Sequence, residues 1–208
     1  NIVNNLLSIQ NELKIKINKL NFENYNPNIV AVSKTFAIKD ILPLINHGHL
    51  HFGENKVQES LEKWTSIKND FKNLKLHMIG KLQTNKVKYV VPLFDYIHSV
   101  DSLKLAQKIS QEQIKNNKIM KLFIQINVGN EDQKNGILID QLDNFYNKCT
   151  KDLGLNIIGL MCLPPNDNNS SIYFSKMQQL VQKLQLKDIS MGMSNDYLEA
   201  INYQSTYL

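Results

Sequence analysis

Lys34 is the residue in this sequence whose position best suits covalent chemistry. It follows the apolar run 29–32 and Ser33, and an amphipathic segment, 38–46, comes after it. The run predicts a strand buried on both faces, so Lys34 stands at the strand's carboxyl end, where parallel α/β folds assemble their sites. A lysine amine that is partly desolvated there can form a Schiff base with a carbonyl compound. The alternative is a solvated surface charge, because all 24 basic residues are lysines.

The segment 190–194, Ser-Met-Gly-Met-Ser, could hold a phosphate carried by such a carbonyl compound. It follows a predicted strand and precedes a predicted short helix at 197–202. Its N–H groups and hydroxyls could therefore face an anion at a helix N-terminus. The alternative is a plain helix cap, with Ser194 or Asn195 at the N-cap position.

Histidines and one asparagine are weaker candidates. His47, His49 and His51 alternate, but a glycine interrupts them and no carboxylate or cysteine cluster completes a metal site, so no metal is expected. For His77, a packed, hydrogen-bonded strand histidine is the favoured interpretation. Asn127 could face a site or satisfy backbone groups at its strand end.

Strand-like and helix-like segments alternate along the whole chain, after an amphipathic helix over residues 1–20. Strands are expected at 29–34, 51–55, 74–80, 96–100, 121–128, 155–160 and 189–194, and residues 205–208 begin an extended segment. Gly48 should end the helix at 38–46, and Asp101 or Ser102 should cap the helix after 96–100. This α/β order with short links predicts a (β/α)₈ TIM barrel.

In a barrel the strand ends would converge on one mouth. They would bring together Lys34, Asn55, His77, Ile79, Gly80, His98, Asn127, Met161 and residues 190–194. An open doubly wound sheet is the second choice, because no GxGxxG motif follows any strand.

Composition and charge exclude several classes of protein. The 208 residues are 42% hydrophobic and 21% charged, which suits one globular domain over residues 1–208. No apolar run reaches the roughly 20 residues of a membrane-spanning helix, so no membrane partner is expected. The net charge is +5, but charges are interleaved and arginine is absent, which argues against a nucleic-acid partner. Only Cys149 and Cys162 are present, so we expect a cytoplasmic protein. We also expect a monomer.

Five motifs, in order, carry a specific resemblance to a known family. They are 31–35 (AVSKT), 52–59 (FGENKVQE), 77–86 (HMIGKLQTNK), 159–161 (GLM) and 190–194 (SMGMS). Together they resemble the YggS/PROSC family of pyridoxal 5′-phosphate-binding homeostasis proteins, and the similarity runs from about residue 29 to the end of the sequence.

The resemblance implies a barrel of the alanine racemase N-terminal domain type, with pyridoxal 5′-phosphate (PLP) held as a Schiff base on Lys34. It implies a ring pocket beside Asn55, Ile79 and Gly80, and a phosphate site at 190–194. The cofactor-binding residues expected in this way are Lys34, Asn55, Ile79, Gly80, Met161, Ser190, Met191, Gly192, Met193 and Ser194. Family members continue after positions 205–206 into an Arg-Ile-Gly-Thr segment, whose arginine faces the pyridine nitrogen and whose Gly-Thr completes the phosphate site. Tyr207 and Leu208 stand here instead, so the last strand is expected to be truncated.

The function that the resemblance implies is intracellular vitamin B6 homeostasis. The protein would hold PLP on Lys34, pass it to apo-enzymes in transient contacts, and catalyse little or nothing itself. The alternative is a small PLP-dependent amino-acid racemase that uses the same lysine as base. A racemase needs a second acid/base on the opposite face of the substrate, and the resemblance assigns that role to a tyrosine of a second domain, which a chain of this length lacks. A nucleic-acid-binding protein, suggested only by the net charge, is a third possibility.

Overall fold

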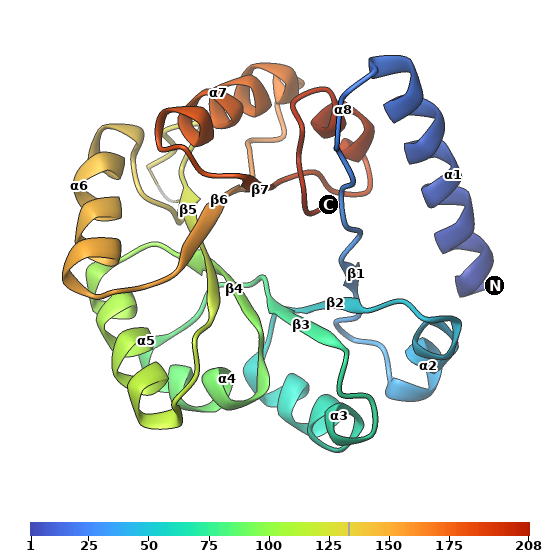
Figure 1. Ribbon diagram of the computed structural model, residues 1–208, viewed down its shortest axis with the longest axis horizontal. Coiled ribbons are helices and arrows are strands. Elements are labelled where there is room, and N and C mark those ends of the chain that lie inside the picture. The colour runs from blue at the N-terminus through green and yellow to red at the C-terminus, as the bar shows by residue number, and fades with distance from the viewer. Residues whose placement is uncertain (133) are drawn as a thin grey trace.

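The computed structural model describes residues 1–132 and 134–208, and it consists of parallel strands surrounded by helices (Figure 1). The described strands are neighbours in chain order, and each adjacent pair is parallel: β1 (Ala31–Val32), β2 (His51–Glu54), β3 (Lys75–Met78), β4 (Tyr96–Val100), β5 (Lys121–Ile126), β6 (Ile157–Cys162) and β7 (Asp188–Ser190). The helices are α1 (Ile2–Leu20), α2 (Ile38–His47), α3 (Val57–Asp70), α4 (Val87–Leu93), α5 (Leu103–Asn116), α6 (Leu142–Asn147), α7 (Ser170–Lys183) and α8 (Tyr197–Ile201). Short 3₁₀ turns, Thr84–Lys86 and Ile139–Gln141, precede α4 and α6, and a π-helical turn, Lys148–Asp152, follows α6.

Local sequence sets the ends of several helices. The Asn1 side chain caps α1 by accepting a hydrogen bond from the N–H of Val3 (2.8 Å). Ser102 caps α5 through its hydroxyl, which confirms one of the two predicted caps. Gly48 ends α2 with φ +102°, a left-handed conformation that a glycine adopts without a Cβ clash, and this also confirms a prediction. These ends fix where each helix returns the chain to the sheet.

The last residues of the chain close the sheet into a barrel. The N–H of Asn28 donates to the carbonyl of Thr206 (2.8 Å), and the N–H of Leu208 donates to the carbonyl of Asn28 (3.0 Å). On the other side, the N–H of Met191 donates to the carbonyl of Tyr207 (3.2 Å). Residues 205–208 therefore lie between β7 and the segment that enters β1, in the position of an eighth strand (Figure 1). The predicted (β/α)₈ barrel with an extra N-terminal helix is confirmed, and these four residues represent its last strand.

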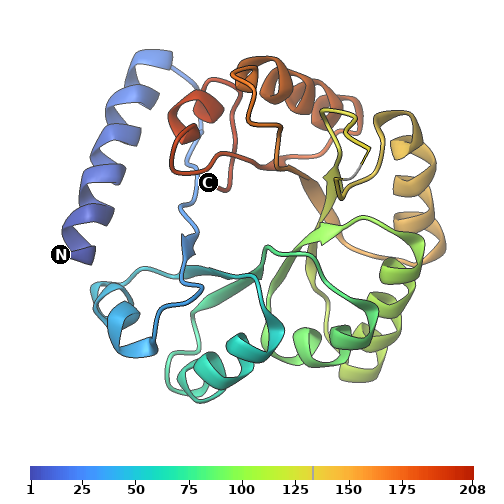
Figure 2. The same ribbon diagram turned by 180° about the vertical axis from the view of Figure 1, so that it is seen from behind.

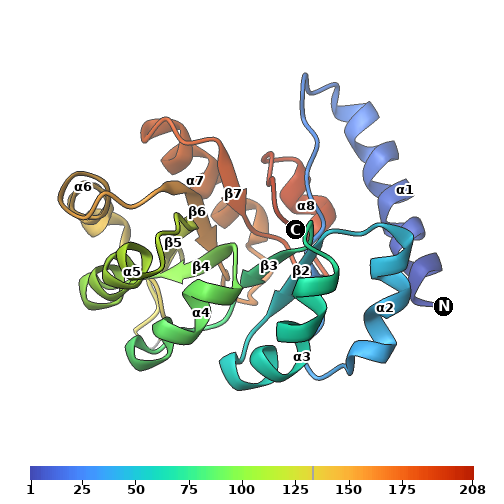
Figure 3. The same cartoon turned by 60° about the horizontal axis from the view of Figure 1, so that its bottom comes forward.

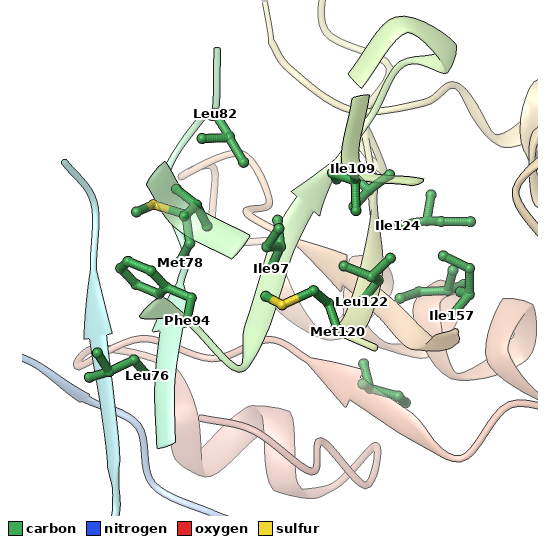
Figure 4. Close-up of a cluster of buried hydrophobic side chains, with 14 of the residues drawn as sticks. Leu76, Met78, Leu82, Phe94, Ile97, Ile109, Met120, Leu122, Ile124 and Ile157 are labelled. Carbon is green, nitrogen blue, oxygen red and sulfur yellow. The ribbon is translucent and has the colours of Figure 1, made fainter. Parts of the chain in front are cut away.

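The main hydrophobic core lies between the strands and the outer helices. Figure 4 shows part of it, where side chains of β3, β4 and β5 lie with Ile109 of α5 and with Phe94 and Met120 from the adjoining loops. Eight of these side chains are fully buried: Leu76, Met78, Phe94, Ile97, Ile109, Met120, Leu122 and Ile124. Burying one such side chain contributes roughly 1.5–3 kcal/mol. The helices α3, α4 and α5 cover this side of the barrel (Figure 3). This layer holds neighbouring strands in register, and the register decides which strand ends lie together.

A smaller cluster fills the interior of the barrel. It contains Val30, Tyr96, Phe123, Met161 and Tyr207, all buried. Helix α1 lies outside the barrel, where it packs against α2 and α8 (Figure 2). Side chains therefore occupy the middle of the barrel, and a site has to form at one of its ends.

The first strand differs from the prediction. A strand buried on both faces was expected at 29–34, but only Ala31–Val32 form a strand, and Val32 is 46% exposed. Val32 lies at the mouth of the barrel, where it lines both the cavity there and the neighbouring groove beside α1. The apolar run correctly located the strand, but an apolar residue at a barrel mouth need not be buried.

Candidate functional site

A cavity of about 430 Å³ opens at the carboxyl ends of the strands, within the size range of small-molecule sites. Its wall includes every predicted cofactor-binding residue except Ser194: Lys34, Asn55, Ile79, Gly80, Met161, Ser190, Met191, Gly192 and Met193. Of the other residues expected at the mouth, His98 lines the cavity, whereas His77 and Asn127 do not. Ser194 instead lines a neighbouring groove beside α1. Residues that are far apart in the sequence thus share one concave surface.

The backbone on both sides of Lys34 is held by its neighbours. The N–H of Ser33, a buried residue, donates to the carbonyl of Gly53 (3.0 Å), and the N–H of Thr35 donates to Oε1 of Glu59 in the first turn of α3. Thr35 has φ +66°, a left-handed conformation that is rare for a β-branched residue. The sequence left a partly desolvated amine and a solvated surface charge as alternatives for Lys34, and its exposed side chain agrees with the second. A fixed backbone therefore presents an accessible amine at the rim of the cavity.

A buried ion pair lies directly beneath this turn. The fully buried carboxylate of Glu54, at the end of β2, pairs with Nζ of Lys63 from α3 (3.0 Å). The carboxylate also accepts hydrogen bonds from Nε1 of Trp64 (3.1 Å) and from the hydroxyl of Ser33. Lys63 donates in addition to the carbonyl of Ser33. The pair thus ties the end of β2 and helix α3 to the turn that carries Lys34.

Asn55 and Gly80 meet at the ends of β2 and β3. A Cβ on Gly80 would lie 2.7 Å from the carbonyl oxygen of Asn55 and 2.9 Å from its Cα, so a larger residue would displace the Asn55 backbone. The N–H of Ile79 donates to the carbonyl of Glu54 (3.0 Å). Glycine at position 80 therefore lets two neighbouring strand ends approach closely enough to form one wall.

The segment 190–194 forms a compact turn after β7. Ser190 is buried, and Gly192 has φ +103°. A Cβ on Gly192 would lie 2.9 Å from Cβ of Ala200, so this position also favours glycine. The turn places Ser190 and Gly192 in the wall of the cavity.

The alternative interpretation of this turn, a plain helix cap at Ser194 or Asn195, is wrong. Helix α8 begins at Tyr197 with Asp196 as its N-cap residue, not Ser194 or Asn195. The Asp196 side chain accepts a hydrogen bond from the N–H of Met193 (2.6 Å). One backbone donor expected to face an anion is therefore already used by a carboxylate.

Gln125, Tyr207 and Lys81 also line the cavity, although the sequence patterns did not single them out. The strand β5 ends at Ile126, so Gln125 is the last of its inward-facing positions. Asn127, the residue considered from the sequence, instead bonds the backbone of Glu131 through both amide atoms (2.8 and 3.1 Å) and does not line the cavity. An error of two residues in the expected strand end explains this difference.

The wall is positively charged. Lys34, Lys81 and Lys134 contribute to it, and no carboxylate is among the described residues that line it. Burial raises the pKa of nearby Asp101, whose carboxylate accepts a hydrogen bond from the N–H of Gly136 (3.3 Å). A cavity with this charge suits an anionic ligand.

The phenol of Tyr207 is the only aromatic hydroxyl among the described wall residues. Its oxygen lies 3.2 Å from the hydroxyl oxygen of Tyr96 in the barrel interior. Burial and this hydrogen bond raise the pKa of Tyr207 above its usual value. The phenol therefore stays protonated and is poorly suited to act as a base.

The donor set fits an aromatic aldehyde that carries a phosphate. An accessible amine can bind the aldehyde, lysines and a hydroxyl can hold the phosphate, and Val30, Met161 and Met191 offer apolar surface for a ring. Over residues 1–132 and 134–208, no group of three or more His, Cys, Asp or Glu side chains could hold a metal ion. No helix among these residues is long and apolar enough to cross a membrane.

Comparisons with known proteins match the whole barrel. The family model described as alanine racemase, N-terminal domain, matches residues 10–208. The pyridoxal phosphate homeostasis protein of Aquifex aeolicus is 36% identical over 187 residues, which cover 86% of this chain and 81% of that protein. PipY of Synechococcus elongatus PCC7942, solved without PLP, is 28% identical with a TM-score of 0.88, over 100% of this chain and 96% of that one. The structure of PipY with PLP bound has a TM-score of 0.80 at 28% identity, over 94% and 95% of the two chains.

Proposed function

We propose that this chain binds PLP in the cavity at the barrel mouth and acts in PLP homeostasis. The chain belongs to the pyridoxal phosphate homeostasis proteins within the alanine racemase N-terminal domain family. The observation that carries the proposal is a single cavity whose wall includes both the exposed Lys34 and residues 190–193 of the glycine turn. The PipY structure with PLP bound, at 28% identity, supports the choice of cofactor.

The residues of the wall would divide the binding between them. When bound, the cofactor supplies an aldehyde that can be held as a Schiff base on Lys34. Asn55, Ile79 and Gly80 would flank the ring on one side, and Met161 and Met191 on the other. The hydroxyl of Ser190 and the backbone at Gly192, with Lys81, would hold the phosphate. Met193, whose N–H is bonded to Asp196, would only border it, and Ser194 would contribute from the edge of the turn.

We propose holding and release of the cofactor, with little or no catalysis. An amino-acid racemase needs a second acid/base opposite the lysine. Tyr207 is the candidate that the wall offers, but its hydroxyl is bonded to Tyr96 and its raised pKa keeps it protonated. The relatives are named homeostasis proteins, which agrees with this proposal.

Several further properties belong to the proposal. Residues 1–208 would form one PLP-binding domain that acts as a monomer and contacts apo-enzymes transiently to deliver the cofactor. Its place would be the cytoplasm, because Cys149 and Cys162 are both buried free thiols, as a reducing compartment keeps them.

Borohydride reduction followed by peptide mass spectrometry tests the assignment of Lys34. Protein incubated with PLP should carry one pyridoxyl group, on Lys34, and an absorbance band near the visible edge that Lys34→Ala abolishes. Lys81→Ala is the matched control, because Lys81 is also exposed on the same wall, and it should keep the band with weaker affinity. A pyridoxyl group on Lys81 or Lys134 would refute the assignment.

Turnover tests the claim of little catalysis. The PLP-loaded protein should not racemise L-alanine or L-serine beyond the rate of free PLP with an equimolar amine. Turnover that rises with cofactor occupancy and disappears in Lys34→Ala would make the protein a racemase instead.

A further inference from the structure

A continuous line of hydrogen bonds crosses the interior of the barrel. Nδ1 of His51 lies 2.8 Å from Nε2 of His77, and Nδ1 of His77 lies 2.8 Å from Nε2 of His98. Nδ1 of His98 lies 2.7 Å from Oγ of Ser190. These residues, here called the histidine chain, come from β2, β3, β4 and β7. Every link is short enough for a strong hydrogen bond.

The two central rings are fixed by aromatic neighbours. The ring of His77 stacks on Tyr96 at a centroid distance of 4.0 Å, and the ring of His98 stacks on Phe123 at 4.4 Å. His77 is 0% exposed and His98 1% exposed. Their nitrogens therefore meet each other and not water.

Burial keeps all three imidazoles neutral. It lowers the pKa of His98 to about 3 and of His51 to about 4, and it lowers the pKa of His77 well below its usual value. A neutral imidazole has one N–H donor and one acceptor nitrogen. The histidine chain can consequently hold its hydrogens in two arrangements of opposite direction, and each arrangement satisfies every link.

The two ends of the histidine chain lie in different cavities. His98 and Ser190 line the cavity that we assign to the cofactor. His51 is only half-buried and lines a second cavity, of about 720 Å³, at the amino ends of the strands between α1 and the loop before β2. Charged groups near His51, at this amino-end cavity, are Lys75, Lys121 and Asp95. The histidine chain thus joins the site to solvent at the opposite end of the barrel.

We propose that the histidine chain is a proton relay between the cavity at the amino ends of the strands (the lower cavity) and the cofactor site at their carboxyl ends (the upper cavity), an inference that rests on the proposed function. A proton from water binds Nε2 of His51, and the proton on Nδ1 of His51 moves to Nε2 of His77. The Nδ1 proton of His77 moves to Nε2 of His98, and the Nδ1 proton of His98 moves to Oγ of Ser190. The original hydroxyl proton of Ser190 leaves to a basic atom of the ligand, or to water, in the upper cavity.

One proton enters and one leaves, so no charge remains in the barrel interior. Each ring ends as the other neutral tautomer, and reverse transfer restores the first arrangement. Attachment and release of an aldehyde at an amine both require proton transfers. The relay provides a route for them when a ligand fills the mouth.

Hydrogen exchange at the ring nitrogens tests the relay without any cofactor. The exchange rate of the buried His77 ring N–H with solvent is measured by ¹⁵N NMR in the wild-type protein and in His51→Gln. A glutamine side chain at position 51 can still hydrogen-bond Nε2 of His77, but it cannot pass a proton on. If His51 had only a structural role, exchange at His77 would therefore be unchanged in this variant. We expect exchange at His77 to slow by roughly tenfold or more, in line with the contribution of a positioned proton-transfer group.

His47→Gln is the matched control, because His47 is exposed and makes none of the links of the histidine chain. In His47→Gln the exchange rate of the His77 ring N–H should equal that of the wild-type protein. Ser190→Val, which removes the upper end, should slow exchange as His51→Gln does. Equal rates in the wild type and in folded His51→Gln would overturn the relay. Equal exchange rates would overturn the relay but not the proposal that the protein binds PLP. If exchange at His77 slows in His51→Gln but the wild-type protein gives no PLP absorbance band, only the proposed function is overturned.

Discussion

The buried pair of Glu54 and Lys63 gives the sharpest prediction about how the site is held. In Glu54→Gln the side chain keeps its length and an amide oxygen that can accept from Trp64, but it loses its charge. Lys63, whose side chain is 6% exposed, then keeps only the partly exposed carboxylate of Glu59, 3.3 Å away, as its counter-ion. The variant isolates the ion pair from the hydrogen bonds around it.

The magnitude follows from distance and burial. Two unit charges 3.0 Å apart interact by roughly 5 kcal/mol at an effective dielectric constant near 20, before the cost of desolvation is counted. Breaking one partner of a buried pair typically costs about 3–5 kcal/mol when the other charge is left without a partner. Glu59 still compensates part of the Lys63 charge, so we expect Glu54→Gln to lower the free energy of unfolding by about 3 kcal/mol, at the lower end of this range.

A second ion pair in the same chain has the same geometry without the burial. Nζ of Lys183 lies 3.0 Å from Oδ2 of Asp143, and these side chains are 65% and 59% exposed. Asp143→Asn is thus a control matched in distance. It should cost less than about 1 kcal/mol, as exposed pairs do.

Urea unfolding followed by far-UV circular dichroism measures both variants. Fluorescence of Trp64, the single tryptophan, is a weaker probe here because its indole N–H donates to Glu54 itself. The double variant Glu54→Gln/Lys63→Met should recover most of the loss, since it removes the incompletely paired charge of Lys63. If Glu54→Gln costs no more than Asp143→Asn, burial does not govern this pair and the reasoning is refuted.

Three further predictions concern the strand ends and the barrel interior. Gly80→Ala should weaken PLP binding by roughly tenfold or more in a fluorescence titration, because its Cβ would lie 2.7 Å from the carbonyl oxygen of Asn55. Gly159→Ala should destabilise the fold by about 1–3 kcal/mol or more in urea, because its Cβ would overlap the carbonyl oxygen of Asp188 on the neighbouring strand. Burial lowers the pKa of His98 to about 3, so between pH 6.5 and pH 3 the unfolded chain binds a proton at this residue that the folded protein does not. The contribution of His98 to the free energy of unfolding should fall by about 1.4 kcal/mol per pH unit from pH 6.5 toward pH 3, in addition to those of His51 and His77, and urea midpoints in His98→Phe should show a correspondingly shallower pH dependence.

The order of strands and helices could be predicted from the sequence because it depends on local patterns. Apolar runs located each strand, and Gly48 and Ser102 ended or began helices where expected. The convergence of strand ends then followed from the barrel topology. This is why Lys34 and the distant turn at 190–194 could be placed at one mouth from the sequence pattern alone.

The interior of the barrel could not be predicted in the same way. His77 pairs in register with Gly53 on one side and Tyr96 on the other, and these offsets bring His51, His77 and His98 into line. Such offsets arise from the stagger of the whole sheet, which local periodicity does not encode. The favoured interpretation of His77 as a hydrogen-bonded strand residue was right, but its partners depend on how the barrel closes.

Lys34 combines a fixed backbone with an exposed side chain. The N–H of Ser33 bonds the carbonyl of Gly53, and the Glu54–Lys63 pair lies beneath the turn, so neighbouring elements hold the backbone beside Lys34. The strand-end pattern placed this residue at the barrel mouth, but it left a partly desolvated amine and a solvated charge as alternatives. The choice between them depends on which strand ends and turns surround Lys34 in the assembled barrel, and local periodicity does not encode that arrangement.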